Sequence, residues 1–248
     1  AAAGRAVSAR GGVRDFTAIL DATWPAAGGS RVGPFVVRVG EGGGRRVSAA
    51  TACGAWGVDD IAAAEDLQQR LGQSPLFMLR EGEGPLDAAL AARGYGVIDP
   101  VVIWEAPVSA FAVAGTPAEV LWPPDAGCAA LWAAGGIGPA RLAVMRRAPG
   151  LKCVVRAGSG NTPAGVAFLA TEGRSSMLHA LHVAPEHRRC GVARAIMAKA
   201  AEWSGAQGAT HLCLAVTRAN LPANALYASL GMAIVGQYHY REKPLVPR

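Results

Sequence analysis

The spacing of hydrophobic positions changes on either side of Pro185. Residues 178–183 form a short apolar run with the length and pattern of a buried strand, and Pro185 ends that run. Over residues 192–203 apolar side chains recur at three- and four-residue spacing, which is typical of a helix. The sequence therefore predicts a buried strand, a short loop and a helix in direct succession.

The loop between this strand and this helix is basic and contains a glycine at the start of the helix. It reads Arg188-Arg189-Cys190-Gly191-Val192-Ala193. The first N–H groups of a helix have no partner within it, and together with the helix dipole they favour a phosphate. Gly191 allows the backbone to approach a ligand closely, and Ala193 keeps the first turn free of bulky side chains. The pattern predicts an anion site at this helix start.

A second strand and helix follow. Residues 211–217 are rich in apolar and β-branched side chains, which predicts a strand. Residues 220–231 predict a helix that Gly231 closes, and residues 233–240 predict one more strand. This succession of strands and helices indicates the α/β (α+β) class.

The two segments resemble the two motifs of the GCN5-related N-acetyltransferase (GNAT) family. Arg188, Gly191 and Ala193 match the acyl-CoA signature Q/R-x-x-G-x-G/A, and residues 220–232 resemble the second motif, N-x-x-A-x-x-L-Y-x-x-x-G-F/M. The resemblance is strong from about Ala112 to Tyr240. It implies a mixed, mostly antiparallel sheet flanked by helices. It also implies transfer of an acetyl group from acetyl-CoA to a primary amine of a small molecule, amino acid or peptide by direct attack in a ternary complex.

The same resemblance implies which residues hold the cofactor. Backbone N–H groups of Leu181 and Val183 would meet the acetyl carbonyl and the pantetheine arm. Asn220 would bond the cofactor arm, although an Asn after a strand is equally typical of a turn. The phosphates would lie on Arg188, Arg189, Cys190, Gly191, Val192, Ala193 and Arg194.

Acetyl transfer needs an acid for the leaving thiolate and a way to remove the proton of the amine. By resemblance Tyr227 is the acid, since a phenol keeps its proton at neutral pH; otherwise it is a core residue. Strand alternation predicts that His179 shares a face with Leu181 and Val183, and an imidazole titrates near neutral pH. His179 is therefore the first candidate base and Glu172 the second. A satisfied core histidine and an ordered water as base remain open.

The N-terminal part shows a shorter version of the same pattern. Residues 36–38 match residues 154–156, and the glycine-closed helix of residues 85–94 matches residues 222–231. We interpret the chain as two GNAT-like halves, 1–110 and 111–248, of which the first is a degenerate copy with little left of its central strand.

Three positions indicate that only the C-terminal half carries an acyl-CoA site. Asp59 and Asp60 begin the corresponding helix and would repel a pyrophosphate, and Leu90 stands in the place of Tyr227. The first half is expected to wall one side of the acceptor groove. Tryptophans would either line that groove or pack between the halves: Trp24, Trp56, Trp122 and Trp132.

Composition and charge bear on whether the chain has a packed core, spans a membrane or binds nucleic acid. Hydrophobic residues make up 51% of the chain and charged residues 17%, which supplies a packed core, and no apolar run reaches the roughly 18 residues of a membrane span. The net charge of +6 is distributed over single residues and pairs such as Arg45-Arg46, so neither nucleic acid nor a membrane is the expected partner. Residues 1–14 are expected to form a loose leader or extension.

The five cysteines are odd in number and widely spaced, which indicates free thiols in a reducing cytoplasm. Ligand spacing for a metal is lacking. The alternative function is a non-catalytic CoA-binding or protein-interaction module, and an exposed sheet edge is compatible with a homodimer. The sequence does not identify the acceptor amine.

Overall fold

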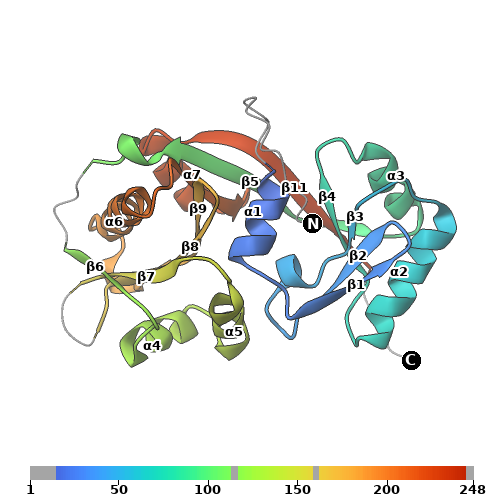
Figure 1. The fold of residues 1–248 in the computed structure, drawn as a ribbon, viewed down its shortest axis with the longest axis horizontal. Helices are drawn as coiled ribbons and strands as arrows, with labels where there is room; N and C mark the ends of the chain where they lie inside the picture. The colour runs from blue at the N-terminus through green and yellow to red at the C-terminus, as the bar shows by residue number, and fades with distance from the viewer. Residues whose placement is uncertain (1–14, 113–116, 159–161, 244–248) are drawn as a thin grey trace, which may run out of the picture.

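The computed structural model describes residues 15–112, 117–158 and 162–243. The extension expected over residues 1–14 lies outside these ranges. Two lobes lie side by side, and two long strands, β5 (Gly96–Pro107) and β11 (Ala233–Glu242), run from one lobe to the other (Figure 1). The molecule is therefore organised around strands that both lobes share.

The elements follow the chain in a regular order. Before β5 they are α1 (Phe16–Thr23), β1 (Gly28–Val32), β2 (Phe35–Val39), the 3-10 turn η1 (Arg45–Val47), β3 (Thr51–Ala52), α2 (Val58–Arg70), β4 (Leu76–Arg80) and α3 (Gly84–Ala92). After it come η2 (Val108–Ala110), β6 (Ala118–Leu121), α4 (Ala126–Ala134), α5 (Pro139–Arg147), β7 (Lys152–Ala157), β8 (Gly165–Glu172), β9 (Ser175–Val183), η3 (Pro185–His187), α6 (Val192–Ala206), β10 (His211–Thr217) and α7 (Leu221–Ser229).

Side-chain caps and prolines set several helix starts. Asp15 accepts hydrogen bonds from the amides of Thr17 and Ala18 at the start of α1, and Asp125 accepts one from Cys128 at the start of α4. Prolines occupy the first turn of α3, α5 and α7, where a missing N–H costs nothing. The predicted helix over residues 192–203 is confirmed and continues to Ala206.

Within the described residues the large sheet has eight strands in the order β4-β11-β5-β10-β9-β8-β7-β6. Its pairs are antiparallel except for β9 with β10, so the predicted mixed, mostly antiparallel sheet is confirmed. β11, the last strand, lies between β4 and β5, while β5 also pairs with β10. The final strands of the two parts of the chain are thus exchanged between the lobes.

Helices cover both faces of the sheet in the C-terminal lobe. On one face α6 forms the α6 cluster, which includes Val155, Leu178, Ile196 and Tyr227. On the other face Trp24, Trp132, Val144 and Phe168 belong to the α4 cluster. The N-terminal lobe has its own core around Phe35, Ile61, Phe77, Leu79 and Leu90. In the part of the chain that the structure describes, no helix is long and apolar enough to cross a membrane.

Candidate functional site

The parallel strands β9 and β10 separate at the middle of β9. Their pairing runs from Ser175 and His211 to Leu178 and Leu214 and stops there. Beyond this point a cavity of about 270 Å³ is lined by His179 and Ala180 from β9 and by residues 215–217 from β10. Beside this cavity β9 therefore has no strand partner on its β10 side.

A β-bulge lies in β9 at this split. Val166 pairs with His182 and Phe168 with His179, so two steps along β8 correspond to three along β9, and Ala180 has a left-handed φ of 53°. A bulge reverses the faces of the residues that follow it. The prediction that His179 shares a face with Leu181 and Val183 is therefore wrong.

The surroundings of each side chain confirm this reversal. Leu181 and Val183 pack against the α6 cluster. The ring of His179 lies 5.0 Å from that of Trp24 and 6.1 Å from that of Phe168, both in the α4 cluster. His182 also faces the α4 side, because a Cβ built on Gly135 would lie 2.5 Å from its ring. Strict alternation fails here because one inserted residue changes the face.

Both ring nitrogens of His179 are occupied. Nη1 of Arg46 lies 3.1 Å from Nδ1, and because a guanidinium can only donate, Nδ1 is the acceptor. Nε2 therefore carries the proton and donates to Oγ1 of Thr23 at 2.9 Å. Burial, and then the charge of Arg46, hold the pKa of His179 well below its ordinary value. A neutral imidazole whose lone pair is already engaged is poorly suited to take a proton from an amine.

Glu172 lies at the far end of the β8–β9 hairpin. It is exposed and pairs with Ser175, whereas the cavity begins at His179, four positions further along β9. The structure therefore does not bring Glu172 to the cavity.

Tyr227 lies on α7, on the same side of the sheet as Leu181 and Val183. Its ring is buried in the α6 cluster, 6.4 Å from the ring of Trp104. Burial raises the pKa of its phenol above the ordinary value, so the hydroxyl keeps its proton. The hydroxyl makes no hydrogen bond with any of the described residues, which leaves it available to a ligand.

The basic loop leads into α6 through two left-handed residues, Arg189 with φ 65° and Gly191 with φ 80°. The loop is exposed, and within the described part of the chain the amides of residues 189–194 donate to no carbonyl or side chain. Arg194 holds the loop side of α6 against α7 through a 2.6 Å bond to Ser229. Free amides at a helix start suit an anionic group.

Asn220 caps the start of α7. Its Oδ1 accepts a hydrogen bond from the amide of Ala223 at 3.3 Å and caps α7. The geometry thus favours the turn-residue reading of Asn220 over a bond to the cofactor arm.

Comparison with known proteins shows what this segment is similar to. Residues 127–232, which contain the split, the basic loop and Tyr227, match the model of the Acetyltransferase (GNAT) family. This part of the chain is therefore similar to GNAT acetyltransferases. It is 43% identical over 56 residues to streptothricin acetyltransferase of Streptomyces lavendulae, covering 23% of this chain and 30% of the relative. It is 36% identical over 61 residues to the uncharacterized N-acetyltransferase YobR of Bacillus subtilis, covering 25% of each. The matched segments thus span less than a third of either relative's length.

Solved GNAT structures resemble a larger share of the chain. A GCN5-related N-acetyltransferase from Kribbella flavida has a TM-score of 0.71 at 16% identity. The matched region covers 92% of this chain and 93% of the Kribbella chain. A tandem GNAT protein from the clavulanic acid biosynthesis pathway has a TM-score of 0.59 at 16% identity, covering 81% and 76%. At these identities the likeness concerns the fold.

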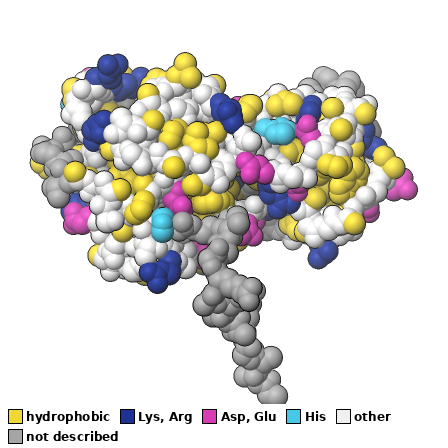
Figure 2. Space-filling model, turned by 90° about the horizontal axis from the view of Figure 1, so that it is seen from above, with side chains coloured by type: hydrophobic (Ala, Val, Ile, Leu, Met, Phe, Trp, Pro, Cys, Tyr) yellow, Lys and Arg dark blue, Asp and Glu magenta, His cyan; other side chains and the backbone are white. Residues whose placement is uncertain are grey.

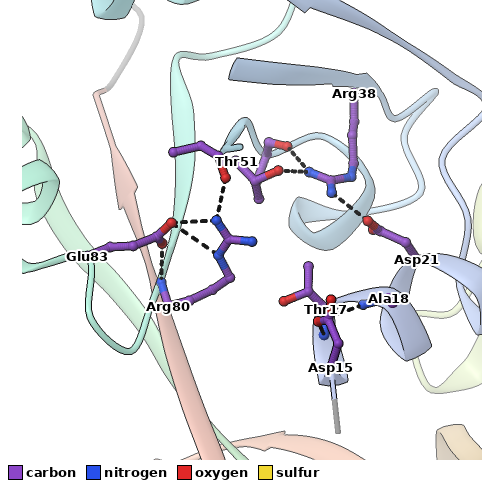
Figure 3. Close-up of polar contacts among 10 residues, drawn as sticks. Asp15, Thr17, Ala18, Asp21, Arg38, Thr51, Arg80 and Glu83 are labelled. Carbon is purple, nitrogen blue, oxygen red and sulfur yellow. Dashed lines mark hydrogen bonds and ion pairs between the residues drawn. The ribbon is translucent and has the colours of Figure 1, made fainter. Parts of the chain in front are cut away.

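In the N-terminal lobe two arginines connect neighbouring elements. At the end of β4 the guanidinium of Arg80 reaches across to the carbonyl of Ala52 in β3 and pairs with Glu83 (Figure 3). Arg38 is likewise satisfied there by Asp21 and Thr51 (Figure 3). These side chains connect β3, β4 and α1 within the N-terminal lobe.

The N-terminal part also supplies residues to the cavity beside the β9–β10 split. The sequence analysis did not predict most of them. Trp24 lines the cavity and also packs in the α4 cluster, whereas Trp56 borders a different hollow and Trp132 is buried. The further lining residues are Gly43, Gly44, Arg45, Arg46, Asp99, Val101, Ile137, Arg141, Tyr238 and Tyr240. The Gly-rich turn before Arg45 and Arg46 and the alternation of Tyr238 and Tyr240 on β11 were signals that could have indicated them.

Proposed function

We propose that the chain is an N-acetyltransferase that moves an acetyl group from acetyl-CoA to a primary amine of a small molecule, amino acid or peptide. The observation that carries this proposal is the split between β9 and β10 beyond Leu178 and Leu214. The split has the basic loop and Tyr227 on the α6 side and the cavity with Trp24 and His179 on the other. This arrangement lets donor and acceptor meet at the central strand from opposite sides.

On the donor side the free amides of residues 189–194 would hold the pyrophosphate. Backbone N–H groups of Leu181 and Val183 would meet the pantetheine arm and the acetyl carbonyl, because β9 has no partner on its β10 side beyond Leu178. Within the described residues no group of His, Cys, Asp and Glu is arranged to hold a metal ion.

In the proposed reaction the amine nitrogen attacks the thioester carbonyl. The new C–N bond forms, the C–S bond breaks, and Tyr227 gives its proton to the departing thiolate. Because His179 is neutral and engaged with Arg46 and Thr23, the amine's proton passes to water in the open cavity. Tyr227 is then reprotonated from solvent.

The exchanged strands support a duplicated origin with halves 1–110 and 111–248. β4, α3 and β5 follow one another as β10, α7 and β11 do, and Leu90 and Tyr227 are each the seventh residue of a nine-residue helix. After each of these helices the pattern is repeated: the amide of Tyr95 bonds to Leu90 and that of Met232 to Tyr227. Strand pairing aligns β2 with β8, since each lies next to the strand before α2 or α6. The sequence match of residues 36–38 with 154–156 therefore joins strands that are not equivalent.

Calorimetric titration of acetyl-CoA tests the donor site. Gly191→Glu places bulk and negative charge in the loop, so binding should be lost. Gly173→Glu is the matched control, because Gly173 also has a left-handed φ, 56°, but lies in the β8–β9 turn. Release of CoA thiol with a panel of amines then tests transfer. Binding without transfer to any amine would favour a non-catalytic CoA-binding module, and equal loss in both variants would remove the loop from the site.

A further inference from the structure

The cavity beside the β9–β10 split contains a cation that no described residue neutralises. Arg46 forms no ion pair with any described residue. Its Nη1 is fixed on His179, while its Nε is shielded from solvent and has no hydrogen-bond partner. Burial lowers the pKa of Arg46, but the nearby phenol oxygens of Tyr238 and Tyr240 outweigh this, and the guanidinium stays charged.

Two other arginines, Arg38 and Arg45, have the charged partners that Arg46 lacks. Arg38 is buried, and it bonds to Asp21, the carbonyl of Ala49 and the hydroxyl of Thr51 (Figure 3). Arg45, next to Arg46 in the same cavity, pairs with Asp99 at 3.0 Å and Glu242 at 3.4 Å. Because a shielded cation without a counter-charge is unfavourable, the lone Arg46 is a group prepared for an anionic ligand.

A second unpaired donor lines the same cavity. The hydroxyl of Tyr238 is buried and has no hydrogen-bond partner in the described part of the chain. The ring of Tyr240 packs edge-on against that of Tyr238, with 5.5 Å between centroids, which fixes its position on β11. One carboxylate has two acceptor oxygens, which matches the N–H of Arg46 and the O–H of Tyr238.

The loop that carries Arg46 is held in place. A Cβ on Gly43 would lie 2.6 Å from Val144 of α5, so the turn is pressed against that helix. The amide of Val47 bonds to the carbonyl of Gly44, whose φ of 102° starts the 3-10 turn η1. With His179 on its other side, the guanidinium of Arg46 is positioned before a ligand arrives.

From these observations we infer that the acceptor carries a carboxylate beside its amine, and that Arg46 and Tyr238 bind this carboxylate. The inference rests on the proposed acetyl transfer and names its substrate class. The cavity of about 270 Å³ reaches from Arg46 to residues 215–217 at the strand split, so the carboxylate lies at one end and the amine at the other. This volume suits a single amino acid or the end of a short peptide.

The test compares matched amines with and without the charge. Amino acids and their methyl esters, and dipeptides and their C-terminal amides, are assayed for kcat/KM with acetyl-CoA. We expect the carboxylates to be preferred on the order of 10- to 100-fold, as expected for a hydrogen-bonded charge. The two series distinguish a free amino acid from a peptide terminus. A preference for the esters and amides would overturn the inference while leaving acetyl transfer intact.

Two variants test whether Arg46 and Tyr238 cause the preference for carboxylates. Arg46→Met should bring the carboxylate-to-ester ratio close to one, with acetyl-CoA affinity retained. Tyr238→Phe should reduce the ratio with little effect on folding, because its hydroxyl has no partner to lose. Arg70→Met is the control, and its ratio should stay unchanged because Arg70 is exposed at the end of α2 and does not line the cavity. An unchanged ratio in both Arg46→Met and Tyr238→Phe would overturn the inference.

A binding measurement separates this inference from the proposed function. N-acetylglycine and N-acetylglycinamide differ in the carboxylate alone, and their affinities can be measured by NMR titration without any turnover. Tighter binding of the acid, lost in Arg46→Met, supports the carboxylate site even if no amine is acetylated. Equal binding of both would count against the site even if acetylation is observed.

Discussion

The guanidinium of Arg46 lies 3.1 Å from Nδ1 of His179, and this contact joins the N-terminal part of the chain to the central strand of the GNAT segment. Oγ1 of Thr23 in α1 accepts a hydrogen bond from the other ring nitrogen at 2.9 Å. The same hydroxyl donates a hydrogen bond to the carbonyl of Ile19 at 2.7 Å. The histidine is thus a bridge between α1, the η1 loop and β9. We expect this bridge to position Arg46 at the cavity.

Replacing His179 by Gln tests this positioning task. Loss of the ring contacts should raise the KM of the acceptor and lower the free energy of unfolding by about 1–3 kcal/mol, since buried partners lose their bonds. The pKa of His179 lies well below about 6.5, so the pH profile of kcat/KM should keep its shape in the variant. His182→Gln is the control on the same strand. A profile that loses its acidic limb together with a large fall in kcat would instead identify His179 as the base.

Replacing Tyr227 by Phe removes the proposed acid alone. We expect kcat to fall by about 100-fold or more, with the Kd of acetyl-CoA nearly unchanged, because the ring remains packed in the α6 cluster. Burial raises the pKa of Tyr227 above its ordinary value of about 10, so the protonated form persists as the pH rises. The wild-type kcat should accordingly show no descending limb from Tyr227 between about pH 7 and 10. Unchanged turnover in Tyr227→Phe would remove its assigned role.

Local sequence pattern was sufficient for the elements of the donor side. The change of spacing around Pro185 predicted β9, the loop and α6, and Gly191 has the left-handed φ that a glycine there permits. These features depend on a few neighbouring residues. Lys and Arg also lie scattered over the face seen in Figure 2, as the sequence pairs suggested.

Features set by distant contacts could not be predicted in the same way. The bulge at Ala180 reverses the face of His179, yet nothing in the alternation of residues 175–183 marks an inserted residue. The position of β11 between β4 and β5 depends on pairing across the whole chain. The sequence shows Arg46 only as part of a basic pair, because its contact with His179 spans 133 positions.

Asp87 ties α3 to β11, and its ionisation should contribute to stability. Arg241 donates to both carboxylate oxygens, at 2.8 and 3.0 Å, and His239 donates to Oδ1 at 2.7 Å. The bonds from Arg241, with a further contribution from His239, lower the pKa of Asp87 to about 2 despite partial burial. Because the unfolded value is about 3.9, the carboxylate stabilises the fold above that pH, and the stabilisation is lost as the pH falls through about 2.

Asp87→Asn should therefore lower the free energy of unfolding by about 1–2 kcal/mol near neutral pH. The difference from wild type should shrink as the pH approaches about 2. Urea unfolding at several pH values measures it. Asp66→Asn is the control, since Asp66 is exposed and forms no ion pair with the described residues. A difference that stays constant down to low pH would mean that the effect does not come from the charge.

The exchanged strands predict that the C-terminal half does not stand alone. A fragment of residues 111–248 lacks β5, which pairs with β10 from His211 to Thr217 and with β11 along its other edge. Its β10 would have an exposed edge and its β11 would lose both neighbours, β4 and β5, which favours aggregation. We expect this fragment to be insoluble or to fail to bind acetyl-CoA. A fragment of residues 96–248 restores β5 and should be recovered in larger soluble yield. If the shorter fragment were monomeric and bound acetyl-CoA like the full chain, β5 would be dispensable for the site.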